Sequence, residues 1–487
     1  MSAGGKELAH VIPGSFDERV AAALEDLGLR ENVRVATDRF HLARPLRLAE
    51  DLADVDAWKA AARAIKAQAV SHLDSYLAQA AASIRRNGGH VHFAADADEA
   101  RRIALDIAQR AGAKMAVKSK SMVSEELHLN HALAAAGIEP VETDLGEYLI
   151  QLAGKTPIHI IAPAFHMGLD EIVDLFEKEA GHALPHDPPQ LTRWARGQLR
   201  GKFLQADVGI SGGNFVVAET GTLCLVSNEG NARLCTSLPR VHIALVGMEK
   251  LVPTLADLGV MISLLARHAT AQKISVYTTL ISGPRRGGEV DGPAEFHVVF
   301  IDNGRSNALG GEFEEALYCI RCGACLNACP VYRNVGGYTY GGVYPGPIGA
   351  VITPLLAGLA EAPELPHASS LCGACWDACP VGIHLHDHLL HLRRRLVEER
   401  HVSRMEQFVF RLWVRLWSRP GTYRLTARLA RWLALPFARH GRLTWAPGPL
   451  KGWTAQRDFP LPAARSFRDR WADLEREAPT GEASRRG

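Results

Sequence analysis

The sequence predicts a mixed α/β protein in which a domain with a mainly parallel sheet is flanked by helical regions. Three observations support this fold class: an alanine-rich N-terminal region with helical periodicity, a central region of alternating strands and helices, and two cysteine clusters followed by an arginine-rich region. We divide the 487 residues accordingly into 1–86, 87–303, 304–396 and 397–487. A chain of this length can bury two or three separate cores.

Residues 1–86 are expected to be helical. Segments such as "LADVDAWKAAARAIKAQAVSHLDSYLAQAAASIRRN" are rich in alanine and place apolar residues at every third or fourth position. The run Asn87-Gly88-Gly89 that follows is a helix stop signal. We therefore expect the helical region to end at residue 86.

Residues 87–303 are expected to form the α/β domain. Short segments with strand character occur among helical ones, and this alternation predicts a mainly parallel sheet: "HVHFAA", "KMAVKS", "IEPVET" and "IHIIAP". Asp96 and Glu99 provide a capping start for the first helix of the domain. Further on, "NFVVAETGTLCLVSNEGNARL" predicts two paired strands with a polar turn, and "RVHIALVG", "ISVYTTLIS" and "EFHVVFID" supply more sheet.

Composition narrows the classes of function. The net charge is only +2, so no overall field favours nucleic acid. The first twenty residues do not resemble a secretory signal, and no run of about 18 apolar residues predicts a membrane span. Seven of the nine cysteines lie in two clusters, which is typical of a reduced metal site in the cytoplasm and not of disulfides.

The stretch "CIRCGACLNACP" carries the strongest chemical signal. Its cysteines, Cys319, Cys322, Cys325 and Cys329, have the spacing C-x2-C-x2-C-x3-C-P of bacterial ferredoxins. Three thiolates on a tight loop can reach three irons of one 4Fe-4S cluster, whereas the fourth, after a longer step, ligates the other cluster. Zinc would require two CxxC pairs around one ion, which seven cysteines with two Cys-Pro endings fit poorly.

A second run, "SSLCGACWDACP", repeats the pattern but has Ser369 where the first cysteine is expected. In two-cluster ferredoxins the fourth cysteine of each run binds the cluster of the other run. This crossed rule assigns the ligands here. The first cluster takes Cys319, Cys322, Cys325 and Cys379, and the second takes Cys329, Cys372 and Cys375. The fourth ligand of the second cluster is open: Ser369, a water, a substrate atom or His367 are alternatives, and so is a three-iron cluster. We favour a four-iron cluster with a non-cysteine ligand.

Two long segments resemble one family. The phrase "CIRCGACLNACPVYRNVGGYTYGGVYPGPIGAVITPLL" with "SSLCGACWDACPVGI" is similar to iron–sulfur subunits that serve 2-hydroxy acid oxidation. "SGGNFVVAETGTLCLVSNEGNARLCTSLPRVHIALVGMEKLVPT" resembles the domain named after lactate utilisation. Together and in this order, over roughly residues 20 to 470, they resemble the lactate utilization protein B family.

The resemblance implies a cytoplasmic electron carrier with two 4Fe-4S clusters. It implies partner subunits with which L-lactate is oxidised to pyruvate, and an α/β domain with the fold of ribose-phosphate isomerases and CoA transferases. Glycolate or another 2-hydroxy acid fits the residues equally well. The family pattern has seven cluster cysteines, so the absence of a cysteine at Ser369 is part of that pattern. Cys224 and Cys235 lie outside the pattern and are expected to be small buried hydrophobes.

An anion site in the α/β domain is a further hypothesis. Polar residues gather beside two apolar strands, where a carboxylate or phosphate could bind: Glu219, Thr220, Asn228, Glu229, Asn231 and Arg233. A solvated hairpin explains the same residues, and we favour it. Lys118, Ser119 and Lys120 end a strand before a helix, which is a second anion position that we consider weaker. No nucleophile–base pair, P-loop or dinucleotide motif is evident, so we predict no catalytic residue.

The region after residue 396 is expected to form basic amphipathic helices. Residues 401–442 contain nine arginines, no lysine and one carboxylate, Glu406, and Pro420-Gly421 separates two helices. Such helices can cover the cluster domain or dock on an acidic partner subunit, which we favour. They can also lie on the inner face of an anionic membrane near a quinone-linked acceptor. We expect no nucleic-acid binding, and disorder in the last stretch, "EREAPTGEASRRG".

Overall fold

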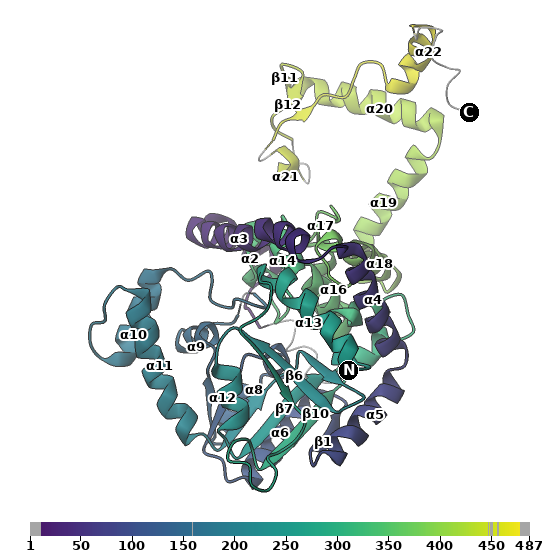
Figure 1. Ribbon diagram of the computed structural model, residues 1–487. Coiled ribbons are helices and arrows are strands. Elements are labelled where there is room, and N and C mark those ends of the chain that lie inside the picture. The colour runs from purple at the N-terminus through teal and green to yellow at the C-terminus, as the bar shows by residue number, and fades with distance from the viewer. Residues whose placement is uncertain (1–10, 158, 447, 449–450, 455–456, 478–487) are drawn as a thin grey trace. The chain divides into compact units, whose positions relative to one another are not determined.

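The chain divides into two units, Met1–Glu398 and Glu399–Gly487, which are described separately. The computed structural model describes residues 11–477 apart from 158, 447, 449–450 and 455–456 (Figure 1). The first unit contains N-terminal helices, a parallel sheet with its helices, and the two cysteine runs. The second unit contains the arginine-rich helices.

A parallel sheet forms the centre of the first unit. Six strands of the described chain pair in the order β1-β10-β7-β4-β2-β3, and every pairing is parallel. Their bounds are β1 (His90–Ala94), β10 (Glu295–Ile301), β7 (Val241–Gly247), β4 (Val208–Ser211), β2 (Met115–Lys118) and β3 (Glu139–Glu142). Because β7 lies inside the sheet and is covered on both faces, all seven of its residues are buried, and apolar residues point to both faces. The expected mainly parallel sheet is confirmed.

Each face of the sheet has its own core. Ile243 and Leu245 of β7 point to one face, where they pack with apolar residues of the helices α6 (Ala97–Arg110), α7 (Met122–Glu126) and α8 (Leu129–Ala135). Ala244 and Val246 alternate to the other face and pack with α5 (Leu73–Arg86). As expected, Asp96 caps α6 by accepting the N–H of Glu99. Helices α7 and α8 are separated at His128, whose φ is +47°.

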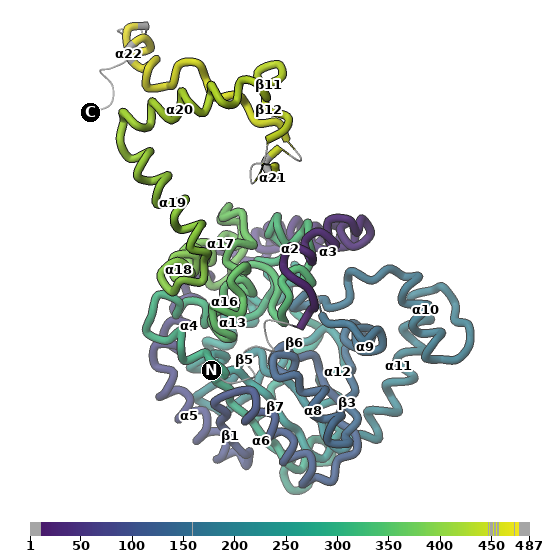
Figure 2. The backbone as a smooth tube through the Cα atoms, turned by 180° about the vertical axis from the view of Figure 1, so that it is seen from behind, coloured from purple at the N-terminus to yellow at the C-terminus, as the bar shows by residue number. Residues whose placement is uncertain are grey.

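A smaller sheet lies on the α5 side. Its order is β8-β5-β6-β9, with bounds β8 (Leu251–Val252), β5 (Phe215–Val217), β6 (Thr222–Ser227) and β9 (Tyr277–Ile281). The pairing of β5 with β6 is antiparallel, which confirms the expected pair of strands. The remaining helices of the domain are α9 (Leu145–Leu152), α10 (Leu169–Ala180), α11 (Pro188–Gln205), α12 (Asn231–Ser237) and α13 (Leu255–Thr270). Helices α9, α10 and α11 pack together beyond β3 (Figure 2).

The strand expected over "IHIIAP" is wrong for the described residues 159–163, which form bends and the start of a turn. The reason is His159, whose Nδ1 accepts the backbone N–H groups of Ile161 and Ala162, each at 3.1 Å. Burial lowers the pKa of His159 to about 3, so the ring is neutral and available as an acceptor. Its Nε2 lies 3.2 Å from Asn327 Oδ1, so the segment is bound to the cysteine region instead of a neighbouring strand.

Helices before and after the sheet enclose the cysteine runs. The N-terminal helices are α2 (Phe16–Glu25), α3 (Leu27–Asp51), α4 (Val55–Ser71) and α5, which ends at Arg86 as expected. The cysteine region contains α14 (Ala324–Ala328), α15 (Tyr332–Val335), α16 (Gly346–Ala357), α17 (Ala374–Asp377) and α18 (Leu385–Glu398), joined by short 3-10 turns. Helix α3 packs against α14 and α15 (Figure 1). Helix α16 is buried along most of its length.

The second unit is helical with a small sheet. Its helices are α19 (Arg404–Trp417), α20 (Pro420–Ala434), α21 (Lys451–Thr454) and α22 (Phe467–Glu477), and Pro420 begins α20 as expected. Its short strands are β11 (Ala438–Arg439), β12 (Arg442–Leu443) and β13 (Phe459–Pro460). Across the described parts of both units, no helix combines the length and apolar character that crossing a membrane requires. Of the end expected to be disordered, residues 475–477 belong to α22, and residues 478–487 lie outside the described part.

Candidate metal centre

The two cysteine runs have the same backbone conformation. Arg321 and Leu371, which occupy equivalent positions, have φ values of +58° and +55°. Gly323 and Gly373 follow at +75° and +81°, in the left-handed region where glycine is favoured. Each glycine then begins a short helix, α14 or α17. Since non-glycine residues seldom adopt positive φ, the shared geometry shows a true structural repeat and not only a sequence pattern.

Thiols from both runs surround one small cavity. The cysteines that line it are Cys319, Cys322, Cys325 and Cys379. The remaining lining is mostly apolar, with Ile348 and Ile383 among it. The structure therefore brings together the four cysteines that the crossed rule assigns to the first cluster. Four thiols around a closed, apolar cavity are the donor set that a 4Fe-4S cluster requires.

The other three cluster cysteines lie near one another. Burial raises the pKa of Cys375 to about 12, and the charges of Cys329 and Cys372 act in the same direction. Cys372 is exposed, whereas Cys329 and Cys375 are buried. The second group thus has one exposed thiol, whereas three thiols of the first group are buried and Cys319 is partly buried.

Ser369 occupies the place that Cys319 has in the first run. Cys319 Sγ accepts the backbone N–H of Arg321 at 3.4 Å, and Ser369 Oγ accepts the equivalent N–H of Leu371 at 3.1 Å. The Ser369 side chain therefore repeats the backbone contact that Cys319 makes in the first run. His367, the other candidate side chain, is exposed.

We predict that Ser369→Cys makes the second cluster more resistant to loss of iron. A thiolate binds iron more tightly than a hydroxyl, and the backbone at residue 369 already has the ligand conformation. After brief exposure to air, the variant should retain about four irons in this cluster where the unmodified protein forms a three-iron species. Electron paramagnetic resonance (EPR) of the oxidised samples measures the three-iron signal. Equal signals in both proteins would show that residue 369 is not at the cluster.

Backbone hydrogen bonds and buried cations surround the thiols. The N–H groups of Tyr332 and Ile383 donate to Cys329 Sγ and Cys379 Sγ at 3.5 and 3.4 Å. Such bonds stabilise negative charge on sulfur and influence the reduction potential of a bound cluster. Lys66 is also buried nearby, and its ammonium group donates to the backbone carbonyls of Glu249 and Leu251, the latter at 3.3 Å. Burial lowers the pKa of Lys66 to about 8, so it can compensate the charge of the thiolates at neutral pH.

A chain of buried ion pairs connects the sheet to the first cysteine run. Arg305, which is fully buried, donates through Nη1 and Nη2 to both carboxylate oxygens of Glu126, each at 2.8 Å. Its Nε donates to Glu249 Oε2 at 2.7 Å, and the other oxygen of Glu249 lies 3.5 Å from Arg321 Nη2. Tyr344 adds a hydrogen bond to Glu126 at 2.7 Å. The position of Arg321 is thereby fixed relative to β7 and α7.

A second, larger cavity of about 690 Å³ lies at the carboxyl ends of the strands. Residues within three positions after β2, β3, β4 and β7 line it, which is where ligands bind in open α/β sheets. Of the six residues proposed as an anion site, Asn228, Glu229 and Asn231 line the cavity. The others are not part of its lining: Thr220 lies at the opposite end of β6, with Glu219 before it, and Arg233 is exposed on α12.

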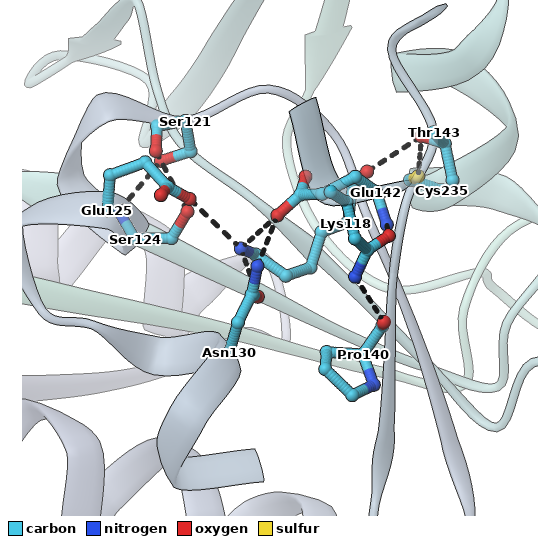
Figure 3. Close-up of polar contacts among 10 residues, drawn as sticks. Lys118, Ser121, Ser124, Glu125, Asn130, Pro140, Glu142, Thr143 and Cys235 are labelled. Atoms are coloured by element: carbon cyan, nitrogen blue, oxygen red, sulfur yellow. Dashed lines mark hydrogen bonds and ion pairs between the residues drawn. The ribbon is translucent and has the colours of Figure 1, made fainter. Parts of the chain in front are cut away.

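Of the three residues in the weaker anion position, two line the large cavity and one does not. Ser119 and Lys120 line the large cavity. Lys118 is fully buried away from it, and its Nζ lies 2.5 Å from both Glu142 Oε1 and Asn130 Oδ1 (Figure 3). These partners occupy the Lys118 ammonium group, so its role in the described structure is to bind β2 to β3 and α8.

Glu229 gives the cavity a group that titrates near neutral pH. Burial, together with the charge of Asp144, raises the pKa of Glu229 to about 7. In the unfolded chain the pKa is about 4.3. The folded protein therefore holds a proton that the unfolded chain releases, and ionised Glu229 lowers stability as the pH rises from 4 to above 7.

We predict that Glu229→Gln stabilises the protein at alkaline pH. The neutral amide removes the cost of the buried charge, so the free energy of unfolding should rise by about 2 kcal/mol at pH 8 and by less than half of that at pH 5. Denaturant unfolding at both pH values measures this. A gain that is the same at both pH values would contradict the assignment of the raised pKa.

Family models match three consecutive parts of the chain. They are the LUD domain over residues 77–301, a 4Fe-4S dicluster domain over residues 315–383, and the C-terminal domain of lactate utilisation protein B over residues 394–476. Fold and site together define an iron–sulfur protein in which a parallel α/β domain is fused to a two-cluster, ferredoxin-type domain.

Relatives match almost the entire chain. Lactate utilization protein B of Shouchella clausii (strain KSM-K16) is 47% identical over 93% of this chain and 96% of its own. The proteins of that name from Bacillus thuringiensis (strain Al Hakam) and Bacillus cereus (strain AH187) are 46% identical over 94% of this chain and 97% of theirs. The chain belongs to the lactate utilization protein B family, and its cofactors are two 4Fe-4S clusters.

A solved structure is also similar in part. A DUF162 family protein from Deinococcus radiodurans matches 47% of this chain and 98% of its own, at 15% identity and a TM-score of 0.27.

Proposed function

We propose that this chain is the iron–sulfur electron-transfer subunit of a multi-protein complex that oxidises L-lactate to pyruvate. The single observation that carries the proposal is the meeting of both cysteine runs around one cavity, with the remaining thiols beside it. When bound, the two clusters supply one-electron transfer at potentials that the surrounding charges and hydrogen bonds set. The names of the relatives, with 46–47% identity, support lactate as the substrate of the complex over glycolate or another 2-hydroxy acid.

The residues around the two groups of thiols favour a direction for the electrons. Cys322, Cys325 and Cys379 are buried, and the large cavity adjoins their run through Arg321. Cys372 is exposed, so the second group is the one that an external acceptor can approach. We therefore propose that electrons enter on the cavity side and leave near Cys372 towards a respiratory acceptor.

The test is a comparison of the chain alone with the chain in its complex. Anaerobically purified chain should show no lactate oxidation with an artificial electron acceptor. With its partner subunits present, lactate should reduce the clusters, which EPR detects. Lactate oxidation by the chain alone would contradict a role limited to electron transfer. It would favour a second candidate function, an enzyme that itself binds a small carboxylate. The large cavity is the observation that favours this second candidate.

We also propose that α19 and α20 dock on an acidic partner subunit. No described residue of either helix is buried, and large apolar side chains such as Phe408, Trp413 and Trp417 are exposed beside arginines. The double variant Arg411→Glu/Arg415→Glu should lose the partner in a pull-down experiment while its iron content stays unchanged, because α19 holds no cluster cysteine. Retention of the partner, with loss of binding to anionic vesicles instead, would assign these helices to a membrane surface near a quinone-linked acceptor.

A further inference from the structure

The large cavity and the small thiol cavity share a wall. Arg321, which lies inside the first cysteine run between Cys319 and Cys322, lines both of them. On the side of the α/β domain, Lys120 and Lys250 line the large cavity. A ligand at this end of the large cavity would therefore be separated from the first group of thiols by one side chain.

Two cations at this wall have unused hydrogen-bonding capacity. Arg321 is 9% exposed, and its guanidinium lies 4.8 Å from the centre of the Tyr344 ring. Its Nη1 is buried and has no hydrogen-bond partner among the described residues. Lys250 is 5% exposed, and within the described chain its Nζ has neither a hydrogen bond nor an ion pair. A buried donor without a partner, such as Arg321 Nη1, is costly. Lys250 lines the large cavity, so its ammonium group is available there to an acceptor.

Charge compensation for a cluster does not by itself explain these two residues. Four buried cations interact with the charges of the first group of thiols: Arg44 with those of Cys322 and Cys325, and Lys66, Lys250 and Arg321 with that of Cys319. Neither Arg44 nor Lys66 lines the large cavity. What distinguishes Lys250 and Arg321 is therefore their access to the cavity.

The position of the cavity in the sheet also favours a ligand. The chain passes from β2 outwards to β3, whereas it passes from β4 in the opposite direction to β7. The point at which the strand order reverses lies between β2 and β4. Ser119 and Lys120 follow β2, Gly212 and Gly213 follow β4, and all four residues line the cavity. Ligands of open α/β sheets bind at such reversal points.

We propose that this cavity binds a small organic acid of the 2-hydroxy or 2-oxo class, with its carboxylate at Lys250 Nζ and beside the Arg321 side chain. The inference rests on the proposed function and deepens it by locating the acid on this chain. Arg321 and the charged form of Lys250 attract an anion, and burial with the charge of Arg321 lowers the pKa of Lys250 to about 7. Asp144 lines the same cavity, and together with the neighbouring thiolates it repels a phosphate dianion more than a monoanion. Leu225 and Leu265 line the rest of the cavity, which has room for the carbon chain of the acid.

The geometry has a consequence for redox behaviour. A negative ligand beside the first group of thiols makes the addition of an electron there less favourable. By thermodynamic linkage, reduction of the protein weakens ligand binding by the same free energy. Tenfold weaker binding to the reduced protein corresponds to a potential lowered by about 59 mV.

Calorimetry on anaerobic holoprotein in a chloride buffer tests the proposal, with L-lactate, pyruvate and inorganic phosphate as probes. At least one carboxylate should bind, more tightly than phosphate, and Lys250→Gln should weaken it at least tenfold. The matched control Lys178→Gln, at an exposed lysine of α10 outside the cavity, should bind like the unmodified protein. If Lys250→Gln loses iron, Lys250→Arg replaces it: it keeps the positive charge and should retain binding. On the unmodified protein, saturating carboxylate should lower the potential of one cluster.

Three outcomes would overturn the inference: no carboxylate binding, binding that Lys250→Gln leaves unchanged, or tighter binding of phosphate than of both carboxylates. EPR of the same samples separates this inference from the proposed function. Clusters that reduce normally in a protein that binds no carboxylate refute only the carboxylate site. Clusters that cannot be reduced refute the electron-transfer role, whatever the calorimetry shows.

Discussion

Cys325→Ser is expected to remove about half of the iron, from about eight to about four irons per chain. Cys325 is buried, lines the small cavity, and its pKa is raised by burial and by the charges of Cys319 and Cys322. A serine hydroxyl is a much poorer iron ligand than a thiolate, and no other side chain of the cavity lining can replace it. Iron and sulfide analysis of anaerobically purified protein measures the loss.

Two further variants make this prediction specific to the crossed arrangement. Cys379→Ser, although it lies in the other run, should remove the same cluster and give the same EPR spectrum as Cys325→Ser. Cys224→Ala is the control, because Cys224 is buried outside both runs and should keep all the iron. If Cys379→Ser instead resembles Cys375→Ser, each run holds its own cluster and the crossed assignment is wrong.

Arg305→Leu is expected to lower the free energy of unfolding by about 3–5 kcal/mol. The substitution leaves the carboxylates of Glu126 and Glu249 buried without their main cation, and both are almost fully inaccessible to solvent. Burial raises the pKa of Glu249, but the charges of Arg305 and Arg321 outweigh it and lower this pKa to about 2. Without Arg305 the two carboxylates lose that compensation.

Denaturant unfolding at neutral pH measures the loss, with Arg34→Ala as the control. Arg34 pairs with Glu31 at 2.6 Å and with Asp38 at 3.2 Å, and its side chain is more than half exposed. Because solvent screens such pairs, Arg34→Ala should have a much smaller effect. A loss for Arg305→Leu as small as that of the control would show that the buried network does not hold the sheet to the cysteine region.

Sequence patterns predicted the structural features that are determined by residues close together in the chain. The spacing in "CIRCGACLNACP", the alternation of strands and helices, and the stop at Asn87 each depend on neighbouring residues, and the sheet is parallel as expected. The segment over residues 159–163 shows the limit. Its apolar residues suit a strand, but the His159 ring accepts two backbone N–H groups and contacts Asn327, a partner 168 positions away.

The proposed anion site shows a second limit. Glu219 and Asn228 are close in sequence, but the six residues of β6 separate their ends of the hairpin by about 20 Å. Only the fold shows which end faces the cavity. Lys250 and Arg321 were missed for the same reason, because they lie 71 positions apart and meet only where the end of β7 reaches the first cysteine run. Arg321 could have been noticed as a cation within a cysteine run, whereas no local signal marks Lys250.

The measurement that most directly tests the central claim is EPR of the reduced, anaerobically purified protein, together with counts of iron and sulfide. Two neighbouring clusters held by seven cysteines should give about eight irons per chain and a spectrum broadened by magnetic coupling between the clusters. A stoichiometric amount of zinc, or the sharp signal of a single isolated cluster, would contradict the account.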